Sequence, residues 1–193
     1  MNNIQTFDIR HHAQAFKIPP LIVQGIIKVE SDGNPYAYRA EPSYQYLYDV
    51  DQDEPFRDLT QAEMDQDSAP DDFPWYKAIS SQDTEWYGQQ CSWGPMQVMG
   101  AVARERGFRK SFPELCSFDD GVYWGCAHLQ WLAGRYLDEG WNSVISAYNQ
   151  GSPRRNDDGT FCNQEYVENV WMAMQDIACD TAIIREMLNA PSS

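Results

Sequence analysis

Apolar residues recur at helical spacing through most of the chain, and no segment of five or more residues alternates convincingly as a half-buried strand would. Pro19 and Pro20 precede the second periodic stretch, where the first turn of a helix tolerates proline, and Gly33 follows it as a stop signal. Asp119 and Asp120 are placed to cap a longer helix. The pattern predicts helices at about residues 6–16, 20–32, 95–106, 119–136 and 141–150, with one or two more within 164–188. We therefore predict an all-α fold.

The second predicted helix is apolar on most of its circumference, which places it centrally in the core. Val23, Ile27 and Glu30 lie at i, i+4 and i+7, so they share one stripe, and Glu30 faces inward at the carboxyl end of the helix. Apolar surroundings and the negative end of the helix dipole both raise the pKa of a carboxyl group. A carboxyl group that is protonated near neutral pH is what a general acid requires. Glu30 is therefore a candidate catalytic acid, and a frayed helix end that turns Glu30 to water is the alternative.

Charge excludes several kinds of partner. The chain has 193 residues, close to the size of one compact domain, with 14 Lys and Arg against 29 Asp and Glu and a net charge of −15. This balance argues against nucleic acid and anionic membrane surfaces as partners, and no apolar stretch is long enough to span a bilayer. Residues 41–90 carry 13 acidic and two basic side chains without a sustained helical period. We interpret them as a long acidic irregular insertion within a single domain that comprises residues 1–193.

The sequence shows no sign of a metal site. The five cysteines form no CxxC pair, so zinc is not expected, and their thiols are buried or free, with a disulfide between Cys116 and Cys126 as the alternative. The run that starts at Asp49 resembles the beginning of a calcium loop. Its sixth position, however, is Glu54 instead of glycine and its twelfth is Thr60.

Three segments follow one another in an informative order. Residues 30–35 read Glu-Ser-x-x-Asn-Pro, residues 94–99 read Gly-x-Met-Gln-x-Met, and residues 147–151 read Ala-Tyr-Asn-x-Gly. Together they resemble the lytic transglycosylases of the soluble type, which share the lysozyme-like superfamily with goose-type lysozyme. The resemblance covers about residues 20–170, and its wording is most similar to that of phage and prophage members. It implies a lysozyme-like helical domain in which the acidic insertion lies between the catalytic helix and the Gly-x-Met-Gln motif.

The resemblance also implies a set of site residues. Glu30 is the single catalytic acid and base. The residues expected to contact or line the sugar site are Ser92, Gln97, Met99, Tyr148, Asn149 and Tyr166. Within this set, Met99 is expected to pack beside the acid, Tyr148 to donate a hydrogen bond near it, and Tyr166 to close the cleft.

The implied reaction cleaves the β-1,4 bond between N-acetylmuramic acid and N-acetylglucosamine in peptidoglycan glycan strands. Glu30 protonates the glycosidic oxygen, and the 2-acetamido group of the substrate stabilises the cationic carbon, which makes an enzyme nucleophile unnecessary. Glu30 then removes the proton from the C6 hydroxyl, which attacks C1 and leaves a 1,6-anhydromuramyl end. The reaction needs no metal and no cofactor, and we expect a monomer.

Two departures from the family pattern leave a hydrolase as an alternative function. Arg39 stands where the family usually has a serine, and the acidic segment replaces a short connection. If Glu85 or Asp83 positions a water molecule, the chain is a muramidase that acts on the same bond. The aromatic residues ahead of the second motif either stack on sugars or pack in the core: Trp75, Tyr76, Trp86 and Tyr87.

A non-catalytic virion component with this fold is the third alternative. The retained Glu30, Gln97 and Tyr148 argue against it, because a binding protein has no need for a buried carboxyl group. The first residues show no basic head followed by an apolar run, so a signal peptide is not expected. A phage lysin, or an enzyme carried in a phage particle, would be synthesised in the cytoplasm and would act on cell-wall peptidoglycan, so we expect one of these two roles.

Overall fold

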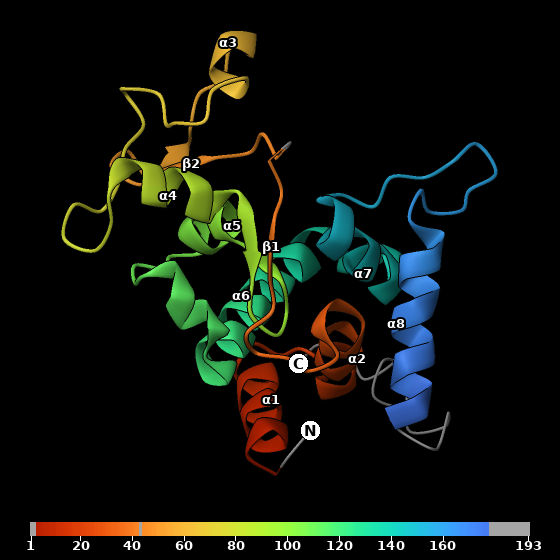
Figure 1. Cartoon of the computed structure of the whole chain (residues 1–193). Coiled ribbons are helices and arrows are strands. Elements are labelled where there is room, and N and C mark those ends of the chain that lie inside the picture. The colour runs from red at the N-terminus through yellow and green to blue at the C-terminus, as the bar shows by residue number, and fades with distance from the viewer. Residues whose placement is uncertain (1–2, 43, 178–193) are drawn as a thin grey trace. The chain divides into compact units, whose positions relative to one another are not determined.

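The computed structural model of the chain describes residues 3–42 and 44–177 (Figure 1). These residues form two compact units. We call residues 3–33 and 125–177 the helical unit and residues 34–124 the mixed unit. Helix α6 belongs to both, since its residues up to Trp124 fall in the mixed unit and those from Gly125 onward in the helical unit.

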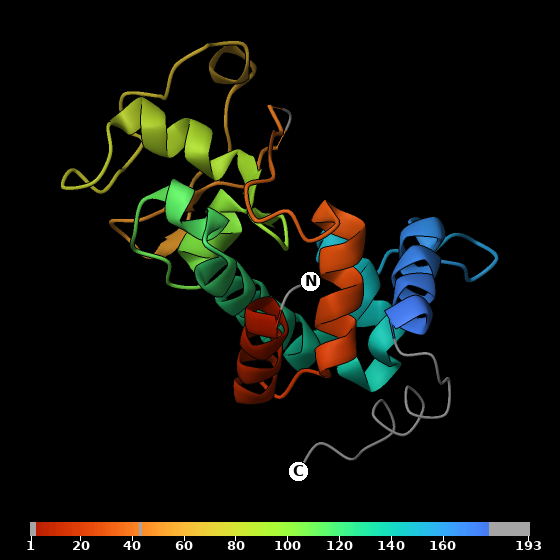
Figure 2. The ribbon, with the colours of Figure 1, turned by 60° about the horizontal axis from the view of Figure 1, so that its bottom comes forward.

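The helical unit is built around the pairing of two helices. Its elements are α1 (Asn3–Ala15), α2 (Pro20–Ser31), the later part of α6 (Phe118–Tyr136), the short 3-10 helix η2 (Leu137–Glu139), α7 (Trp141–Gln150) and α8 (Gln164–Ile177). Helices α2 and α8 lie side by side, and α1 packs against α2 and α7 against α8 (Figures 1 and 2). A Cβ atom on Gly25 of α2 would come within 2.7 Å of Met174 Cγ and 3.0 Å of the Val170 carbonyl oxygen on α8. Glycine at position 25 therefore lets the two helices approach closely.

The prediction that the second helix is central is confirmed. Buried residues occupy several faces of α2, namely Ile22, Val23, Gly25, Ile26 and Ile27. Burying an aliphatic side chain of this size contributes about 1.5–3 kcal/mol, so this one helix is a large part of the core. No helix in the described part of the chain is both long and apolar enough to cross a membrane.

The mixed unit combines short strands with short helices. Its elements are β1 (Tyr38–Ala40), β2 (Tyr48–Asp49), β3 (Glu54–Pro55), α3 (Gln61–Met64), α4 (Gln82–Gln89), β4 (Cys91–Trp93), β5 (Val98–Met99), α5 (Gly100–Glu105), the 3-10 helix η1 (Phe112–Cys116) and the first turns of α6. An antiparallel sheet has the order β1-β4-β5, with Arg39 opposite Ser92 and Ser92 opposite Met99. Strands β2 and β3 form a separate hairpin.

The acidic segment is folded around a small core of its own. Leu47, Phe73 and Trp86 are buried together, and the Phe73 and Trp86 rings meet edge to face at 5.1 Å. On the surface, Arg57 pairs with both Glu63 (2.6 Å) and Asp72 (2.7 Å). The segment thus contains helix, hairpin and core, and the prediction that it is irregular is wrong in that respect.

The all-α prediction is right for most of the chain and wrong for the sheets. The strands are two or three residues long, too short for an alternating pattern to be visible in the sequence. For the same reason the helix predicted at 95–106 shrinks to α5, because residues ahead of it form a turn and β5. At the start of α6, the cap is the Ser117 hydroxyl, which accepts from the Asp120 N–H at 3.1 Å, and not Asp119 or Asp120. Part of the helix predicted within 164–188 lies outside the described residues.

Candidate functional site

Glu30 lies in the last turn of α2, where the chain leaves the helix abruptly. The next residue but one, Asp32, has the left-handed φ of 53° and donates its N–H to the Lys28 carbonyl at 3.2 Å. The Ser31 hydroxyl accepts from the Gly33 N–H at 3.2 Å, which further fixes the turn. The Glu30 side chain is half-buried, so it is neither in the core nor fully in water. This placement agrees with the inward face predicted from the stripe.

The hydroxyl of Tyr166 donates a hydrogen bond to Glu30 Oε1 at 2.6 Å. Tyr166 lies in the first turn of α8, so the pairing of α2 with α8 brings the phenol to the carboxyl group. Burial raises the pKa of Tyr166 well above its ordinary value, and the charge of Glu30 and the hydrogen bond to it add to the rise. Tyr166 therefore keeps its proton at any physiological pH and acts as a permanent donor to Glu30.

Tyr148, from the third motif, belongs to the same neighbourhood. It lies near the end of α7, directly after the buried residues 143–147. Burial raises the pKa of Tyr148 far above its ordinary value, with a further contribution from the charge of Glu30. The ring of His128 on α6 lies 5.5 Å from the Tyr148 ring. The helical unit thus gathers Glu30, Tyr148 and Tyr166, which the sequence placed in three separate segments.

Asn149 is bonded to a residue that the sequence did not single out. Its side-chain oxygen accepts from Asn163 Nδ2 at 3.0 Å, and Asn163 also exchanges hydrogen bonds with Ser146. Asn163 lies directly before α8, where asparagine is a common cap. That position was the available signal in the sequence, but it pointed to helix capping and not to a contact with the third motif.

In the mixed unit, the side chains of Ser92 and Gln97 form a hydrogen bond with each other. The Ser92 hydroxyl donates to Gln97 Oε1 at 2.9 Å, and Gln97 Nε2 donates to the carbonyl oxygens of Ala37 (3.0 Å) and Gly94 (2.9 Å). Gln97 itself has the left-handed φ of 49°. These bonds fix the turn that precedes Met99, which is half-buried at the end of β5.

Two observations show that the first position of the second motif has to be glycine. Gly94 has a φ of +72°, which side chains rarely adopt, and a Cβ there would lie 2.1 Å from the Leu115 carbonyl oxygen. Arg39, which replaces the usual family serine, is exposed on β1 and pairs with Glu41.

Glu85 is engaged in a fully buried ion pair. Its Oε1 accepts from Arg104 Nε at 2.7 Å and its Oε2 from Arg104 Nη2 at 2.9 Å, and both side chains are 0% exposed. Gln89 Nε2 also donates to Oε1 at 3.1 Å. The other candidate, Asp83, accepts from the N–H of Ala69 at 3.0 Å. A carboxylate sealed in this way cannot position a water molecule at a substrate, so the expectation for Glu85 in a hydrolase is not supported.

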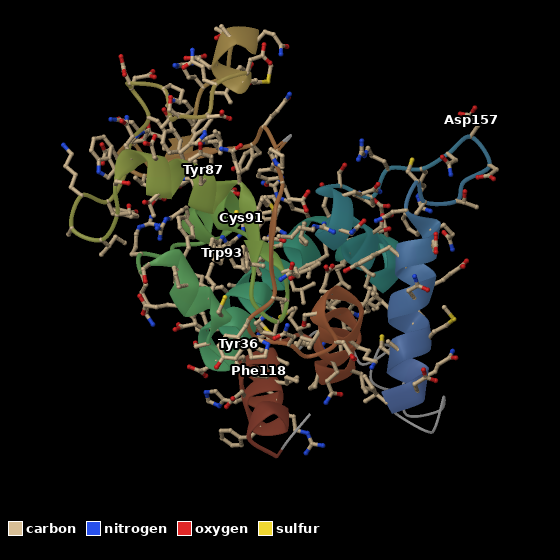
Figure 3. All side chains as sticks on the ribbon, viewed as in Figure 1. Tyr36, Tyr87, Cys91, Trp93, Phe118 and Asp157 are labelled. Carbon is tan, nitrogen blue, oxygen red and sulfur yellow. The ribbon has the colours of Figure 1, made fainter. Side chains whose placement is uncertain are left out.

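Two of the four aromatic residues ahead of the second motif, Trp86 and Tyr76, pack against other side chains. Trp86 belongs to the core of the acidic segment, and the Arg104 guanidinium lies 5.0 Å from the Tyr76 ring centroid. Tyr87 is 47% exposed, and its hydroxyl donates to the Asp67 carbonyl oxygen. Figure 3 labels Tyr87, Cys91 and Trp93 where α4 leads into β4.

Within residues 3–42 and 44–177, the cysteines and the calcium-like run can be placed in the structure. Cys116 and Cys126 are both free thiols, and so are the other described cysteines. Cys179 lies outside the described residues. The run that starts at Asp49 is the β2–β3 hairpin, in which Asp49 Oδ1 accepts from the N–H groups of Asp51 and Gln52, both at 2.9 Å. Residues 3–42 and 44–177 contain no cluster of three or more side chains suited to hold a metal ion.

Comparison with models of protein families gives a match. The family described as the transglycosylase SLT domain matches residues 8–160. No curated protein and no solved structure matches the chain. The matched range includes Glu30 and all three motifs, and it ends before Asn163 and Tyr166.

Proposed function

Because the chain belongs to the transglycosylase SLT domain family, whose members act on peptidoglycan, we propose that it is a lytic transglycosylase of glycan strands. It cleaves the β-1,4 bond between N-acetylmuramic acid and N-acetylglucosamine and leaves 1,6-anhydromuramyl ends. Glu30 is the catalytic residue. A phage lysin or a virion-associated enzyme stays a prediction from the wording of the motifs.

The observation that carries this proposal is the hydrogen bond from Tyr166 to Glu30. A half-buried carboxyl group at a helix end is ordinary, but one that receives a 2.6 Å hydrogen bond from a half-buried phenol is held in a fixed orientation. Fixed orientation is what proton transfer to a glycosidic oxygen requires, since general acid catalysis depends first on geometry.

In the first step Glu30 gives its proton to the glycosidic oxygen. The negative charge that develops on the carboxyl group is stabilised by the Tyr166 hydroxyl, which already donates to Oε1. The bond becomes stronger as the charge grows, so it favours the transition state over the ground state. The substrate 2-acetamido group stabilises the cationic carbon at the same time.

In the second step the Glu30 carboxylate removes the proton from the C6 hydroxyl, and the C6 oxygen attacks C1. The proton count closes, because Glu30 ends the cycle protonated as it began. Tyr166 does not exchange its own proton in either step, since its pKa is held far above the working pH.

The remaining residues are proposed to bind the sugars. In the helical unit, the sugar-binding residues are Tyr148 and Asn149 of α7. In the mixed unit, their place in or near the second motif assigns sugar binding to Ser92, Gln97 and Met99. The Gln97 NH2 group is committed to backbone carbonyls, so its contribution to the substrate is the second lone pair of Oε1 or the loop geometry that it fixes.

Mass spectrometry of the fragments released from purified peptidoglycan tests the proposal. We expect anhydromuramyl ends from the parent protein and none from Glu30→Gln. Glu165→Gln, which changes an exposed glutamate on α8, is the matched control and is expected to retain activity.

Two results would contradict the proposal. Reducing muramic ends from the parent would identify a muramidase. The absence of fragments from both the parent and Glu165→Gln would refute the enzyme assignment.

A further inference from the structure

Asn163 joins the end of α7 to the start of α8 through both polar atoms of its side chain. Its Nδ2 donates to the Ser146 carbonyl oxygen at 3.1 Å and to Asn149 Oδ1 at 3.0 Å. Its Oδ1 accepts from the Ser146 hydroxyl at 2.7 Å. Ser146 is fully buried, so the junction is anchored in the interior of the helical unit.

These bonds are unusual for an asparagine at a helix start. Such a residue ordinarily accepts from a backbone N–H in the first turn of its own helix, and replacing it by alanine then costs about 0.5–2 kcal/mol. Among the described residues, the Asn163 side chain bonds only to α7. Its carbonyl oxygen meanwhile accepts from the N–H groups of Tyr166 (3.0 Å) and Val167 (3.3 Å).

The bond to Asn163 decides which way the Asn149 amide faces. Because Asn163 offers a donor, Asn149 presents its oxygen, and its NH2 group points the other way. Asn149 is exposed, and within residues 3–42 and 44–177 its Nδ2 donates no hydrogen bond. The NH2 group is therefore offered to an acceptor on the substrate, such as a sugar hydroxyl or an acetamido oxygen.

The loop side of α8 is also held by its backbone, since the Phe161 N–H donates to Gln164 Oε1 at 3.2 Å and the Gln164 N–H donates to the Phe161 carbonyl oxygen at 3.0 Å. The loop between α7 and α8 is exposed from residue 154 to residue 160 and extends beyond both helices, with Asp157 at its tip (Figure 3). Asn163 is where this loop meets α8. Tyr166, whose hydroxyl binds Glu30, follows within one turn.

We infer that Asn163 is a positioning residue that sets the Tyr166 hydroxyl on Glu30 and the Asn149 amide toward the substrate. The inference rests on the proposed function and adds to it a residue that none of the motifs includes. A displacement of a catalytic group by about 1 Å lowers rates about a hundredfold, so loss of this junction is costly even though Asn163 touches no reacting atom.

The test measures kcat/KM on soluble glycan fragments for Asn163→Ala and Asn163→Asp, each in the parent and in the Asn149→Ala/Tyr166→Phe background. In the parent we expect both variants to lose about tenfold to a hundredfold. In the double-variant background we expect the further loss to be less than about threefold, because the groups that Asn163 positions are already gone.

The aspartate variant separates positioning from capping. Aspartate caps helices as well as asparagine does and still accepts from the Ser146 hydroxyl, so it keeps α8 folded, but it cannot donate to Asn149 or to the Ser146 carbonyl oxygen. Asn156→Ala is the control, since it removes an asparagine of the same loop whose Nδ2 donates to Thr160 Oγ1 at 2.9 Å. We expect it to leave kcat/KM unchanged.

The outcomes are distinguishable. A parent that releases no anhydromuramyl product overturns the proposed function and this inference together. An active parent in which Asn163→Asp keeps full activity overturns the inference alone. So does an Asn163→Ala loss of the same size in both backgrounds.

Discussion

Replacing Arg104 by methionine would leave the Glu85 carboxylate buried in the mixed unit without its ion-pair partner. In the parent, two N–H groups of Arg104 bind the two carboxylate oxygens, and Nη1 donates to the carbonyl oxygens of Phe108 and Lys110, both at 2.9 Å. The guanidinium also lies 4.2 Å from the Phe112 ring centroid. Methionine occupies a similar volume, so the lost interactions are mainly polar.

The expected destabilisation is about 3–5 kcal/mol, the range found when one partner of a buried ion pair is removed. Most of this loss of stability comes from burying a carboxylate without a partner, and little of it from the net stabilisation that the ion pair provides. Removing both charges should therefore lower the free energy of unfolding less than removing one. We therefore expect Glu85→Leu/Arg104→Met to be more stable than Arg104→Met by at least about 2 kcal/mol.

Urea unfolding of the full chain, followed by tryptophan fluorescence, measures both differences. Arg57→Met is the control, because it removes the same side chain from a pair that is exposed to water, and we expect a much smaller change. If Arg104→Met unfolds within about 1 kcal/mol of the parent, the burial argument is refuted. If the double variant loses as much stability as Arg104→Met and the single variant Glu85→Leu lose together, the two side chains are not coupled as the geometry requires.

Three further predictions concern the acid, the second motif and the tyrosines. Tyr166→Phe should lower kcat by about tenfold to a hundredfold, because a hydrogen bond to a charged group contributes about 1.5–3 kcal/mol; an unchanged kcat would show that the bond has no role in the transition state. Gly94→Ala should destabilise the chain more than Gly159→Ala in thermal unfolding, since both have positive φ but only position 94 has a carbonyl oxygen in the way; equal shifts would contradict this. The folded chain should also lose stability above pH 10, because folding raises the pKa of several tyrosines, that of Tyr48 to about 12, and the folded state then binds more protons than the unfolded state. Absorbance at 295 nm follows the ionisation of the tyrosines, and urea midpoints at pH 9 and 11 measure the loss of stability; equal midpoints would refute the prediction. The other tyrosines whose pKa is raised most are Tyr44, Tyr46, Tyr148 and Tyr166.

The helical unit was largely predictable, because its signals are local. A helix of 12 residues such as α2 repeats its apolar pattern over three turns, and that repetition placed Glu30 on an inward face. Glu30 and Tyr166 are 136 positions apart, and their hydrogen bond was not predicted: the family resemblance implied that Tyr166 closes the cleft and that Tyr148 donates near the acid.

The mixed unit was less predictable, because its stabilising contacts are non-local or too short to form a pattern. Glu85 and Arg104 are charged residues in short helices, where sequence reasoning assigns charges to the surface. The core of the acidic segment joins Leu47 to Trp86, with most of the segment between them. Excess charge in the sequence suggested an irregular loop, whereas a few well-separated apolar residues are enough to fold it.

The close approach at Gly25 has a consequence for the acid itself. Gly25 faces Val170, and Glu30 faces Tyr166, so the two helices run antiparallel and the tight contact lies little more than one turn from the carboxyl group. Because position 25 has no side chain, α2 and α8 can approach closely, and this approach sets the distance between the Tyr166 hydroxyl and the Glu30 carboxyl group. The position of the Tyr166 hydroxyl on the Glu30 carboxyl group thus depends partly on a residue without a side chain, and we expect one added methyl group at position 25 to lengthen or break that hydrogen bond.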